Sequence, residues 1–285
     1  MKKFTIFTPT YNRAYILPQL YTSLINQTDK NFVWLIIDDG STDNTVELIN
    51  SYIIEDKIPI TYIKQQNQGK HIAINNSLDV ITTEYIITVD SDDYLLDNAI
   101  EVCSQLSKKC IDNKIAGFTF INCIEEIPND ILKYGNQLTF DYKKIHLNIK
   151  GEKSVVLKTN ILKNYKFPIF KDEKFCQESY ILTQIIDNHK ILYTDYILAK
   201  GEYLEDGLSQ NIYKRMLANP QYSLATLKVK YKSNNIFNQE EKKHFAINFW
   251  DITLKSKVVH PIKQLFNFPL LGTMFYLKYL IKKKS

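Results

Sequence analysis

Short apolar runs of strand length alternate with segments of helical periodicity through the first 125 residues. The expected strands span residues 4–8, 32–37, 60–63, 85–89 and 116–122, and the expected helices span residues 16–26, 45–54, 72–80 and 98–109. This alternation is typical of βαβ units, in which crossover helices join parallel strands. We therefore predict an α/β fold with a Rossmann-like mixed, mostly parallel sheet flanked by helices.

The pattern becomes irregular after Ile124. We expect loops and short strands first, then a strand with a short helix, then a helix and two strands that complete the sheet; these elements span residues 125–147, 153–157, 178–187, 191–193 and 197–203. From Met216 onward the periodicity is helical. The sequence thus predicts one domain over residues 1–215, in two parts that meet near residue 125, and a C-terminal helical extension over residues 216–285.

Charge is distributed unevenly along the chain. It has 36 Lys and Arg against 31 Asp and Glu, but residues 252–285 contain seven lysines and no acid. The remaining 251 residues therefore carry 29 basic and 31 acidic groups, a net charge of about −2. A net negative charge on residues 1–251 does not attract the phosphates of duplex DNA or RNA, so we expect no nucleic-acid partner.

The basic tail contains an apolar segment, residues 265–281, which Pro269, Gly272 and Lys278 interrupt. As a helix its 17 residues would extend about 25 Å, and the interruptions argue against a membrane-spanning role. We expect instead an interfacial segment whose lysines contact anionic headgroups. The alternative is a terminal helix packed on the body, or on a second copy of the chain in a homo-oligomer.

The expected compartment is the cytoplasm. The N-terminal residues enter the first strand without the apolar block of a signal peptide, and the four cysteines include no CxxC pair. With an interfacial tail, the chain would lie peripherally on the inner face of the cell membrane.

Acidic residues follow two of the expected strands. Asp38 and Asp39 end the strand at residues 32–37 and precede Gly40, whereas Asp90, Ser91, Asp92 and Asp93 follow the strand at residues 85–89. A carboxylate at the first place can accept hydrogen bonds from a pyrimidine N–H or a ribose hydroxyl, and the Asp-x-Asp at the second can bind a divalent cation beside phosphate oxygens. The alternatives are a helix-capping turn and a solvated turn. Ligands of parallel sheets bind at the carboxyl ends of the strands, so two acid-tipped strands favour a binding site.

Four segments occur in a characteristic order: TPTYNR at 8–13, IIDDGSTDNT at 36–45, NQGKHIAIN at 67–75 and VDSDD at 89–93. Together they resemble family 2 glycosyltransferases with the GT-A fold, inverting enzymes that use a nucleotide sugar and usually Mn²⁺ or Mg²⁺. The resemblance covers residues 1–125 and continues loosely to about Asn211. It implies transfer of a hexose or N-acetylhexosamine from a UDP-sugar to a glycan or lipid-linked acceptor in bacterial polysaccharide biosynthesis, with the donor bound by residues 1–125 and the acceptor by residues 126–215.

The resemblance also implies which residues bind the donor. They are Thr8, Pro9 and Tyr11 around the uracil, Asp39 on the base, Asp90 and Ser91 at the ribose and phosphates, and Asp92 at the metal. Arg13, by its type and place, could reach the diphosphate, and its alternative is a surface arginine.

One position departs from the family pattern. Many members have an arginine immediately before the asparagine that matches Asn75, where this chain has Ile74. Lys70 follows Gly69 at the opening of a helix, a place that favours anions, and could approach the nucleotide instead. The neighbouring His71 is either a structural hydrogen-bonding residue or a ligand.

Inversion needs a carboxylate that takes the proton from the attacking hydroxyl. The family places it in a short acidic motif that opens a helix, and the matching stretch here is DEKFCQESYILTQI, residues 172–185. We predict Glu178 as the base, because a run with apolar residues at helical spacing follows it. Family members often have Glu-Asp here with the Asp as base, whereas Ser179 follows Glu178, so Asp172 and Glu173 remain alternatives.

Residues 202–211 resemble a stretch that follows the catalytic helix in many members, where Asp206, Gly207 and Ser209 could close over the donor; the alternative is a surface turn. Two alternative functions make different demands on the sequence. A nucleotidyltransferase would need a Gly-rich phosphate loop after the first strand, which Pro9–Asn12 does not provide. A membrane-attached nucleotide- or glycan-binding subunit without catalysis would tolerate loss of both Asp92 and Glu178.

Overall fold

The computed structural model describes residues 2–124, 126–127, 135–141, 144, 151–201 and 211–284. The chain divides into two compact units. Unit 1 comprises Met1–Asn67, Ala73–Asn164 and His189–Gly207, and unit 2 comprises Gln68–Ile72, Tyr165–Asn188 and Leu208–Ser285. Over the described ranges, no helix combines the length and the apolar character needed to cross a membrane.

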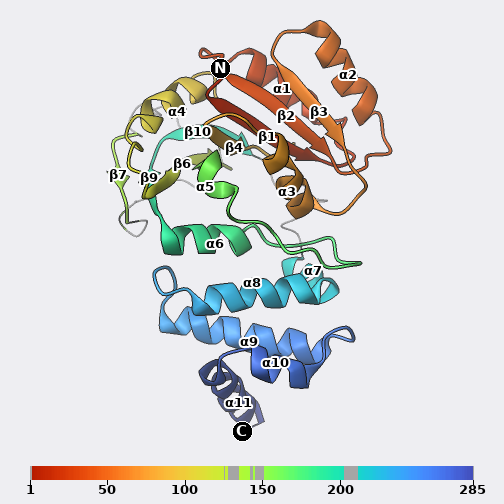
Figure 1. The fold of residues 1–285 in the computed structure, drawn as a ribbon, viewed down its shortest axis with the longest axis vertical. Coiled ribbons are helices and arrows are strands. Elements are labelled where there is room, and N and C mark those ends of the chain that lie inside the picture. The colour runs from red at the N-terminus through yellow and green to blue at the C-terminus, as the bar shows by residue number, and fades with distance from the viewer. Residues whose placement is uncertain are drawn as a thin grey trace. The chain divides into compact units, whose positions relative to one another are not determined.

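Unit 1 is built on a mixed β-sheet (Figure 1). Its described strands are β1 (Phe4–Thr10), β2 (Phe32–Asp38), β3 (Ile60–Lys64), β4 (Tyr85–Thr88), β5 (Asp93–Leu95), β6 (Ile115–Cys123), β7 (Leu138–Thr139), β8 (Gly151–Lys158), β9 (Lys190–Thr194) and β10 (Ile197–Gly201). The main path through the sheet is β3-β2-β1-β4-β8-β6-β10-β5, with β9 on β6 and β7 on β9. Pairing is parallel from β3 to β4 and between β6 and both β9 and β10, whereas β8 is antiparallel to β4 and β6.

Helices cover the two faces of this sheet. They are α1 (Leu17–Ile25), α2 (Thr45–Glu55), α3 (Lys70–Val80), α4 (Ala99–Ser107) and α5 (Thr159–Leu162). The apolar sides of α1, α2 and α4 share one core with Phe4 and Trp34, and Figure 1 shows α3 and α5 across the sheet from them. Trp34, Tyr21 and Tyr52 stack, with 3.7 Å between the centroids of the two tyrosine rings, and so fix α1 and α2 on β2.

The strand order reverses at β1. The chain runs outward from β1 through β2 to β3 and then returns to β4 on the other side of β1. The carboxyl ends of β1, β2 and β4 therefore surround a topological switch point, where open α/β sheets bind their ligands. The acidic turns predicted from the sequence follow β2 and β4.

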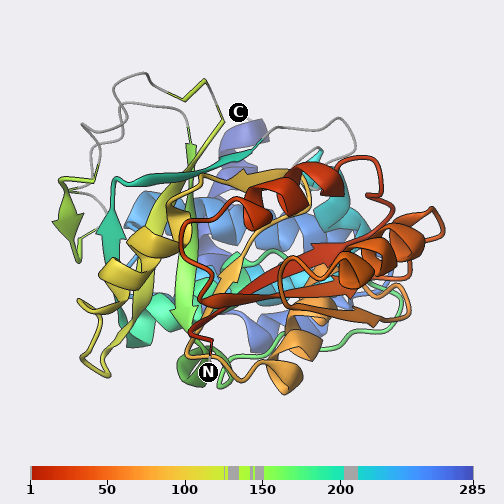
Figure 2. The same cartoon turned by 90° about the horizontal axis from the view of Figure 1, so that it is seen from above.

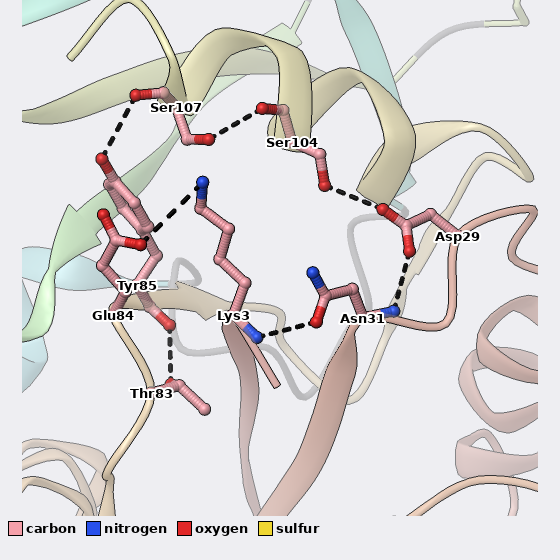
Figure 3. Close-up of polar contacts among 8 residues, drawn as sticks. All are labelled: Lys3, Asp29, Asn31, Thr83, Glu84, Tyr85, Ser104 and Ser107. Atoms are coloured by element: carbon pink, nitrogen blue, oxygen red, sulfur yellow. Dashed lines mark hydrogen bonds and ion pairs between the residues drawn. The ribbon is translucent and has the colours of Figure 1, made fainter. Parts of the chain in front are cut away.

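Polar side chains tie together the opposite, amino ends of these strands (Figure 3). Lys3, before β1, donates from its backbone N–H to Asn31 Oδ1 over 3.0 Å, and its ammonium lies 3.9 Å from a carboxylate oxygen of Glu84. Asp29 accepts hydrogen bonds from the Asn31 N–H at 2.9 Å and from the Ser104 hydroxyl of α4 at 2.8 Å. These contacts hold the strands together at their amino ends, the ends remote from the acidic turns.

Unit 2 is helical in its described residues. Its helices are α6 (Ser179–Asn188), α7 (Ile212–Ala218), α8 (Pro220–Lys232), α9 (Gln239–Lys255), α10 (Pro261–Asn267) and α11 (Leu270–Lys284). Helix α8 packs on α6 and α9, and α9 contacts α11. An aromatic core holds α9 to the C-terminal helices, with the rings of Phe249 and Phe268 stacked 3.9 Å apart and Trp250 beside Tyr276.

The predicted α/β architecture is confirmed, and each element expected before residue 125 is present within two residues of its predicted bounds. Strand β5, which begins at Asp93 inside the second acidic motif, was not predicted from the sequence. The C-terminal helical region begins at Ile212 with α7, four residues before the predicted start at Met216. Figure 2, which views the cartoon from above, shows the twist of the β1–β4 part of the sheet.

Candidate functional site

Asp38 is a structural carboxylate at the end of β2. It is fully buried; its Oδ1 accepts from the Ser41 N–H at 2.7 Å and its Oδ2 from the Tyr62 hydroxyl at 2.7 Å. Gly40 within this turn has φ +84°, a conformation that favours glycine. Burial and the nearby carboxylate raise the pKa of Tyr62, which keeps the phenol a donor. Of the pair Asp38 and Asp39, Asp38 therefore has the structural role, because it stabilises the turn after β2.

Asp39 lies at the switch point. Its backbone N–H donates to the Thr10 carbonyl at 2.8 Å, and its Oδ1 accepts from the Gln65 side-chain amide at 2.8 Å. Gln65, directly after β3, accepts in turn from the Asn76 amide of α3 at 2.7 Å. A nearly buried carboxylate is thus fixed among the ends of β1, β2 and β3.

The three residues predicted to surround a base differ in placement. Thr8 is fully buried, and its hydroxyl oxygen accepts from the Trp34 indole N–H at 3.0 Å, so its side chain belongs to the core. The resemblance placed Thr8 around the uracil, and in this structure its side chain is not exposed there. Pro9 is also buried, whereas Tyr11 is exposed beyond the strand end.

The loops after β1 and β2 are locked together. Asn12, with φ +53°, donates from its backbone N–H to the Ser41 hydroxyl and accepts at Oδ1 from the Thr42 N–H, both at 2.8 Å. Arg13 follows and donates to the Tyr15 hydroxyl at 3.0 Å. Asn12 was missed by the sequence analysis, although asparagine is a residue that often adopts the left-handed conformation in turns.

The second acidic motif is a turn anchored at both ends. The Asp90 carbonyl accepts from the Asp93 N–H at 3.1 Å, and Asp93 opens β5 opposite Gly201 of β10. A Cβ at Gly201 would lie 2.2 Å from Asp93 Oδ1, so a larger residue there would displace the Asp93 carboxylate. Ser91 is buried in the turn, and Asp90 and Asp92 are half-buried.

The carboxylates of this turn are compatible with a divalent cation that takes its other ligands from a substrate and water. In the described part of the chain, no group of three or more His, Cys, Asp or Glu side chains could hold a metal ion by itself. Mg²⁺ does not need a site made entirely of protein side chains, because it commonly binds one or two carboxylates together with substrate phosphates and water. The carboxylate oxygens of the turn are hard ligands suited to that mode, with Asp92 the predicted ligand.

Unit 2 brings together two other predicted residues. Gly69 has φ +95°, and a Cβ there would lie 2.0 Å from the Lys174 carbonyl oxygen, so the turn before α3 contacts the stretch predicted to carry the base. Lys70, the first residue of α3, places its Nζ 2.5 Å from Glu178 Oε1. Both residues were predicted to be functional from the sequence, but their ion pair was not.

Glu178 opens helix α6, as predicted. Its carbonyl accepts from the N–H groups of Ile181 and Leu182 at 3.1 Å each, and its side chain remains 40% exposed. The preceding loop is held by Asn219, whose Oδ1 accepts from the backbone N–H groups of Lys174 and Phe175 at 2.7 and 3.1 Å. Asn219 was not identified from the sequence.

The structure separates Glu178 from its two alternatives. Glu173 is buried, and its two carboxylate oxygens accept from the Gln221 and Tyr222 N–H groups, both at 3.0 Å, at the N-terminus of α8. It therefore caps a helix, where its charge is favourable. Asp172 is exposed with φ +65° and no such role. Asp206, Gly207 and Ser209 lie outside the described residues.

His71 is a buried imidazole next to Lys70. Only 1% of its surface is exposed, and its ring meets the Tyr222 ring edge-on, with centroids 4.3 Å apart. Neither ring nitrogen has a hydrogen-bond partner in the part of the chain that the structure describes. Burial lowers the pKa of His71 to about 4, so the ring is neutral at pH 7.

We predict that His71 makes the fold acid-sensitive. Below pH 6.5 the unfolded chain protonates this residue and the folded chain does not, so stability falls as the pH drops toward 4. The expected loss is about 3 kcal/mol in total. Urea unfolding across this range should show a correspondingly flatter pH dependence for His71→Phe than for wild type, and parallel curves would contradict the assignment.

Comparisons with known proteins bear on this geometry. The sequence model described as "Glycosyl transferase family 2" matches residues 5–157, more than half of the chain. An uncharacterized glycosyltransferase of Haemophilus influenzae is 37% identical over 101 residues, which cover 35% of this chain and 40% of that protein. The GalNAc(5)-diNAcBac-PP-undecaprenol beta-1,3-glucosyltransferase of Campylobacter jejuni is 28% identical over 228 residues, covering 75% and 71% of the two chains.

Solved structures show the same fold. S. aureus TarS 1-349 in complex with UDP-GlcNAc has a TM-score of 0.59 at 18% identity, covering 89% of this chain and 81% of that one. The mannosyltransferase PcManGT from Pyrobaculum calidifontis in complex with GDP-Man and Mn²⁺ has a TM-score of 0.57 at 14% identity, covering 99% and 81%. The chain therefore has the GT-A fold.

Proposed function

Because the chain belongs to glycosyl transferase family 2, we propose that it is an inverting, metal-dependent glycosyltransferase. It moves a hexose or N-acetylhexosamine from a UDP-sugar to a glycan or lipid-linked acceptor in bacterial polysaccharide biosynthesis. The observation that carries the proposal is the arrangement of unit 1, where Asp39 and the Asp90–Asp93 turn follow β2 and β4, the strands on either side of β1 at the switch point.

The uracil and ribose are assigned to the loops after β1 and β2. A carboxylate fixed by Gln65, as that of Asp39 is, can accept a hydrogen bond from the N–H of a pyrimidine ring. Tyr11 lies exposed just beyond the end of β1 and offers an aromatic wall, and the buried Pro9 precedes it by two residues. The UDP-GlcNAc bound by TarS supports UDP as the nucleotide.

We assign the diphosphate to the turn after β4 and to two basic side chains, those of Arg13 and Lys70. Asp90 and Ser91 would face the ribose and phosphates, Asp92 would hold Mn²⁺ or Mg²⁺, and Arg13 and Lys70 would contact phosphate oxygens. A divalent cation at Asp92 would stabilise the negative charge of the leaving diphosphate. The Mn²⁺ that PcManGT binds together with GDP-Man supports this mode.

Glu178 is the proposed catalytic base. Its carboxylate takes the proton from the acceptor hydroxyl while that oxygen forms a bond to the anomeric carbon of the sugar. The bond from that carbon to the diphosphate oxygen breaks on the opposite face, so UDP leaves with the electron pair and the configuration inverts. The undecaprenol-linked acceptor named for the Campylobacter jejuni relative supports a lipid-linked acceptor.

Calorimetry with nucleotides tests the donor assignment. With Mn²⁺ present, UDP should bind the chain at least about tenfold more tightly than ADP or GDP, because one well-placed hydrogen bond to the base accounts for about this factor. Replacement of Asp39 by Asn should remove most of the preference. Equal affinity for the three nucleotides would reject uracil recognition.

We also propose that the C-terminal helices attach the chain peripherally to the inner face of the cell membrane. Large apolar side chains of α10 and α11 are exposed, among them Phe266 at 88%, together with Leu270 and Ile281. The sequence from Ile252 to the C-terminus adds seven lysines and no acid. Exposed apolar side chains in a lysine-rich segment are suited to the boundary of an anionic bilayer.

Vesicle co-sedimentation measures this attachment. The wild-type chain should bind phosphatidylglycerol vesicles more tightly than phosphatidylcholine vesicles, and salt should weaken the binding. The double variant Phe266→Ser, Leu270→Ser should lose at least about tenfold in affinity, because burial of each side chain contributes about 1.5–3 kcal/mol. Ile111→Ser, at an equally exposed apolar position of unit 1, is the matched control. Equal losses in the two variants would reject the assigned surface.

A further inference from the structure

We infer that Lys70 alternates between two anions, the carboxylate of Glu178 in the donor-free chain and the diphosphate of a bound donor. Donor binding thus releases the base for the acceptor. This inference rests on the proposed function and deepens it, because it adds a positioning role for Lys70.

The ion pair is held by backbone anchors on both sides. On one side Gly69 fits against the Lys174 carbonyl, where a Cβ would lie at 2.0 Å, and this contact fixes the turn that begins α3. On the other side Asn219 holds the N–H groups of Lys174 and Phe175, in the loop that leads to Glu178. The 2.5 Å contact between Lys70 and Glu178 is therefore not the meeting of two mobile surface chains.

The same loop is fixed to α8 by a second capping contact. Glu173, five residues before Glu178, accepts from the Gln221 and Tyr222 N–H groups at 3.0 Å. Tyr222 also packs against His71, the residue after Lys70. The start of α3 and the loop before α6 thus share one support, which keeps the ammonium and the carboxylate within reach of each other.

The chemistry of the pair permits exchange. A lysine ammonium is a compact charge with three N–H donors on a flexible stem, and Lys70 is 18% exposed and Glu178 40% exposed. The contact occupies Oε1 of Glu178, one of the two oxygens that can take the proton of the acceptor. A diphosphate carries more negative charge than one carboxylate, and the N-terminus of α3 adds to its attraction.

Competition for Lys70 has a consequence that binding alone can measure. If donor binding requires Glu178 to give up its contact with the Lys70 ammonium, removing the negative charge of Glu178 makes nucleotide binding tighter. Calorimetry with UDP and Mn²⁺ should therefore give about threefold higher affinity for Glu178→Gln than for wild type, the scale of a partly exposed ion pair. The same substitution in a Lys70→Met background should change nothing, whereas in a Lys70→Arg background the gain should persist.

Asp172→Asn is the matched control. It removes one negative charge from the same loop, and asparagine tolerates the left-handed conformation of this exposed position. A general electrostatic effect on an anionic ligand would tighten UDP binding in this variant as well. An equal gain in Asp172→Asn, no gain in Glu178→Gln, or a full gain in the Lys70→Met background would each overturn the inference.

Inorganic diphosphate separates this inference from the choice of donor. If UDP fails to bind but diphosphate with Mn²⁺ follows the same pattern across the variants, the assigned nucleotide is wrong and the exchange of Lys70 stands. If neither UDP nor diphosphate binds the wild-type chain, both the donor site and the exchange are rejected.

Discussion

Replacement of Glu178 by glutamine should lower kcat by about 10³-fold, the central value for loss of a general base. The amide keeps the shape and the hydrogen-bonding capacity of the side chain but cannot take a proton from the acceptor hydroxyl. Because Glu178 caps α6 through its backbone carbonyl, the substitution leaves that cap in place. The expected result is a folded protein with a large loss in kcat.

Three controls bear on this assignment. Asp172→Asn should retain activity within about twofold, because the exposed Asp172 side chain has no role in the proposed reaction. Glu173→Gln should lower the free energy of unfolding by about 1 kcal/mol, because a neutral amide caps α8 less well than the buried carboxylate. Any loss of activity in this variant should therefore follow from its lower stability. Transfer by Glu178→Gln at more than a tenth of the wild-type kcat would remove Glu178 as the base.

Replacement of Asp92 by asparagine should lower kcat/KM by about 10²–10³-fold, because charge stabilisation of a leaving diphosphate by a metal contributes several kcal/mol. UDP binding in this variant should no longer respond to Mn²⁺. Asp92 lies in a turn held by the Asp90 carbonyl and by β5.

Asp97→Asn is the control for Asp92, because it removes an exposed carboxylate four residues after the end of the acidic turn. It should leave both the activity and the response to Mn²⁺ unchanged. Binding of UDP that depends equally on Mn²⁺ in wild type and in Asp92→Asn would show that the metal ligand lies elsewhere.

Much of unit 1 was predictable because its signals are local. Apolar periodicity located β1 to β4 with their helices, and the positions of Asp39 and Asp90 at strand ends followed from that. The sheet partners of β8 and β10 were not predictable, because pairing between strands distant in sequence leaves no local pattern. Strand β5 escaped detection because its three residues are too few to show alternation.

The roles of individual acids depended on tertiary contacts. The sequence could not separate Glu173 from Glu178, because the helix that Glu173 caps begins at Pro220, far along the chain. The pairing of Lys70 with Glu178 is non-local in the same way. Thr8 was assigned to the uracil from the family resemblance alone, because its hydrogen bond with Trp34, on the neighbouring strand, is evident only in the sheet.

The most direct test is a donor screen that measures UDP release from a panel of UDP-hexoses and UDP-N-acetylhexosamines, with Mn²⁺ or with EDTA. The account predicts that one or two of these sugars release UDP with Mn²⁺, that EDTA suppresses the release, and that Asp92→Asn suppresses it equally. Absence of UDP release from every sugar, with membrane lipid extract added as a source of acceptor, would contradict the proposed function.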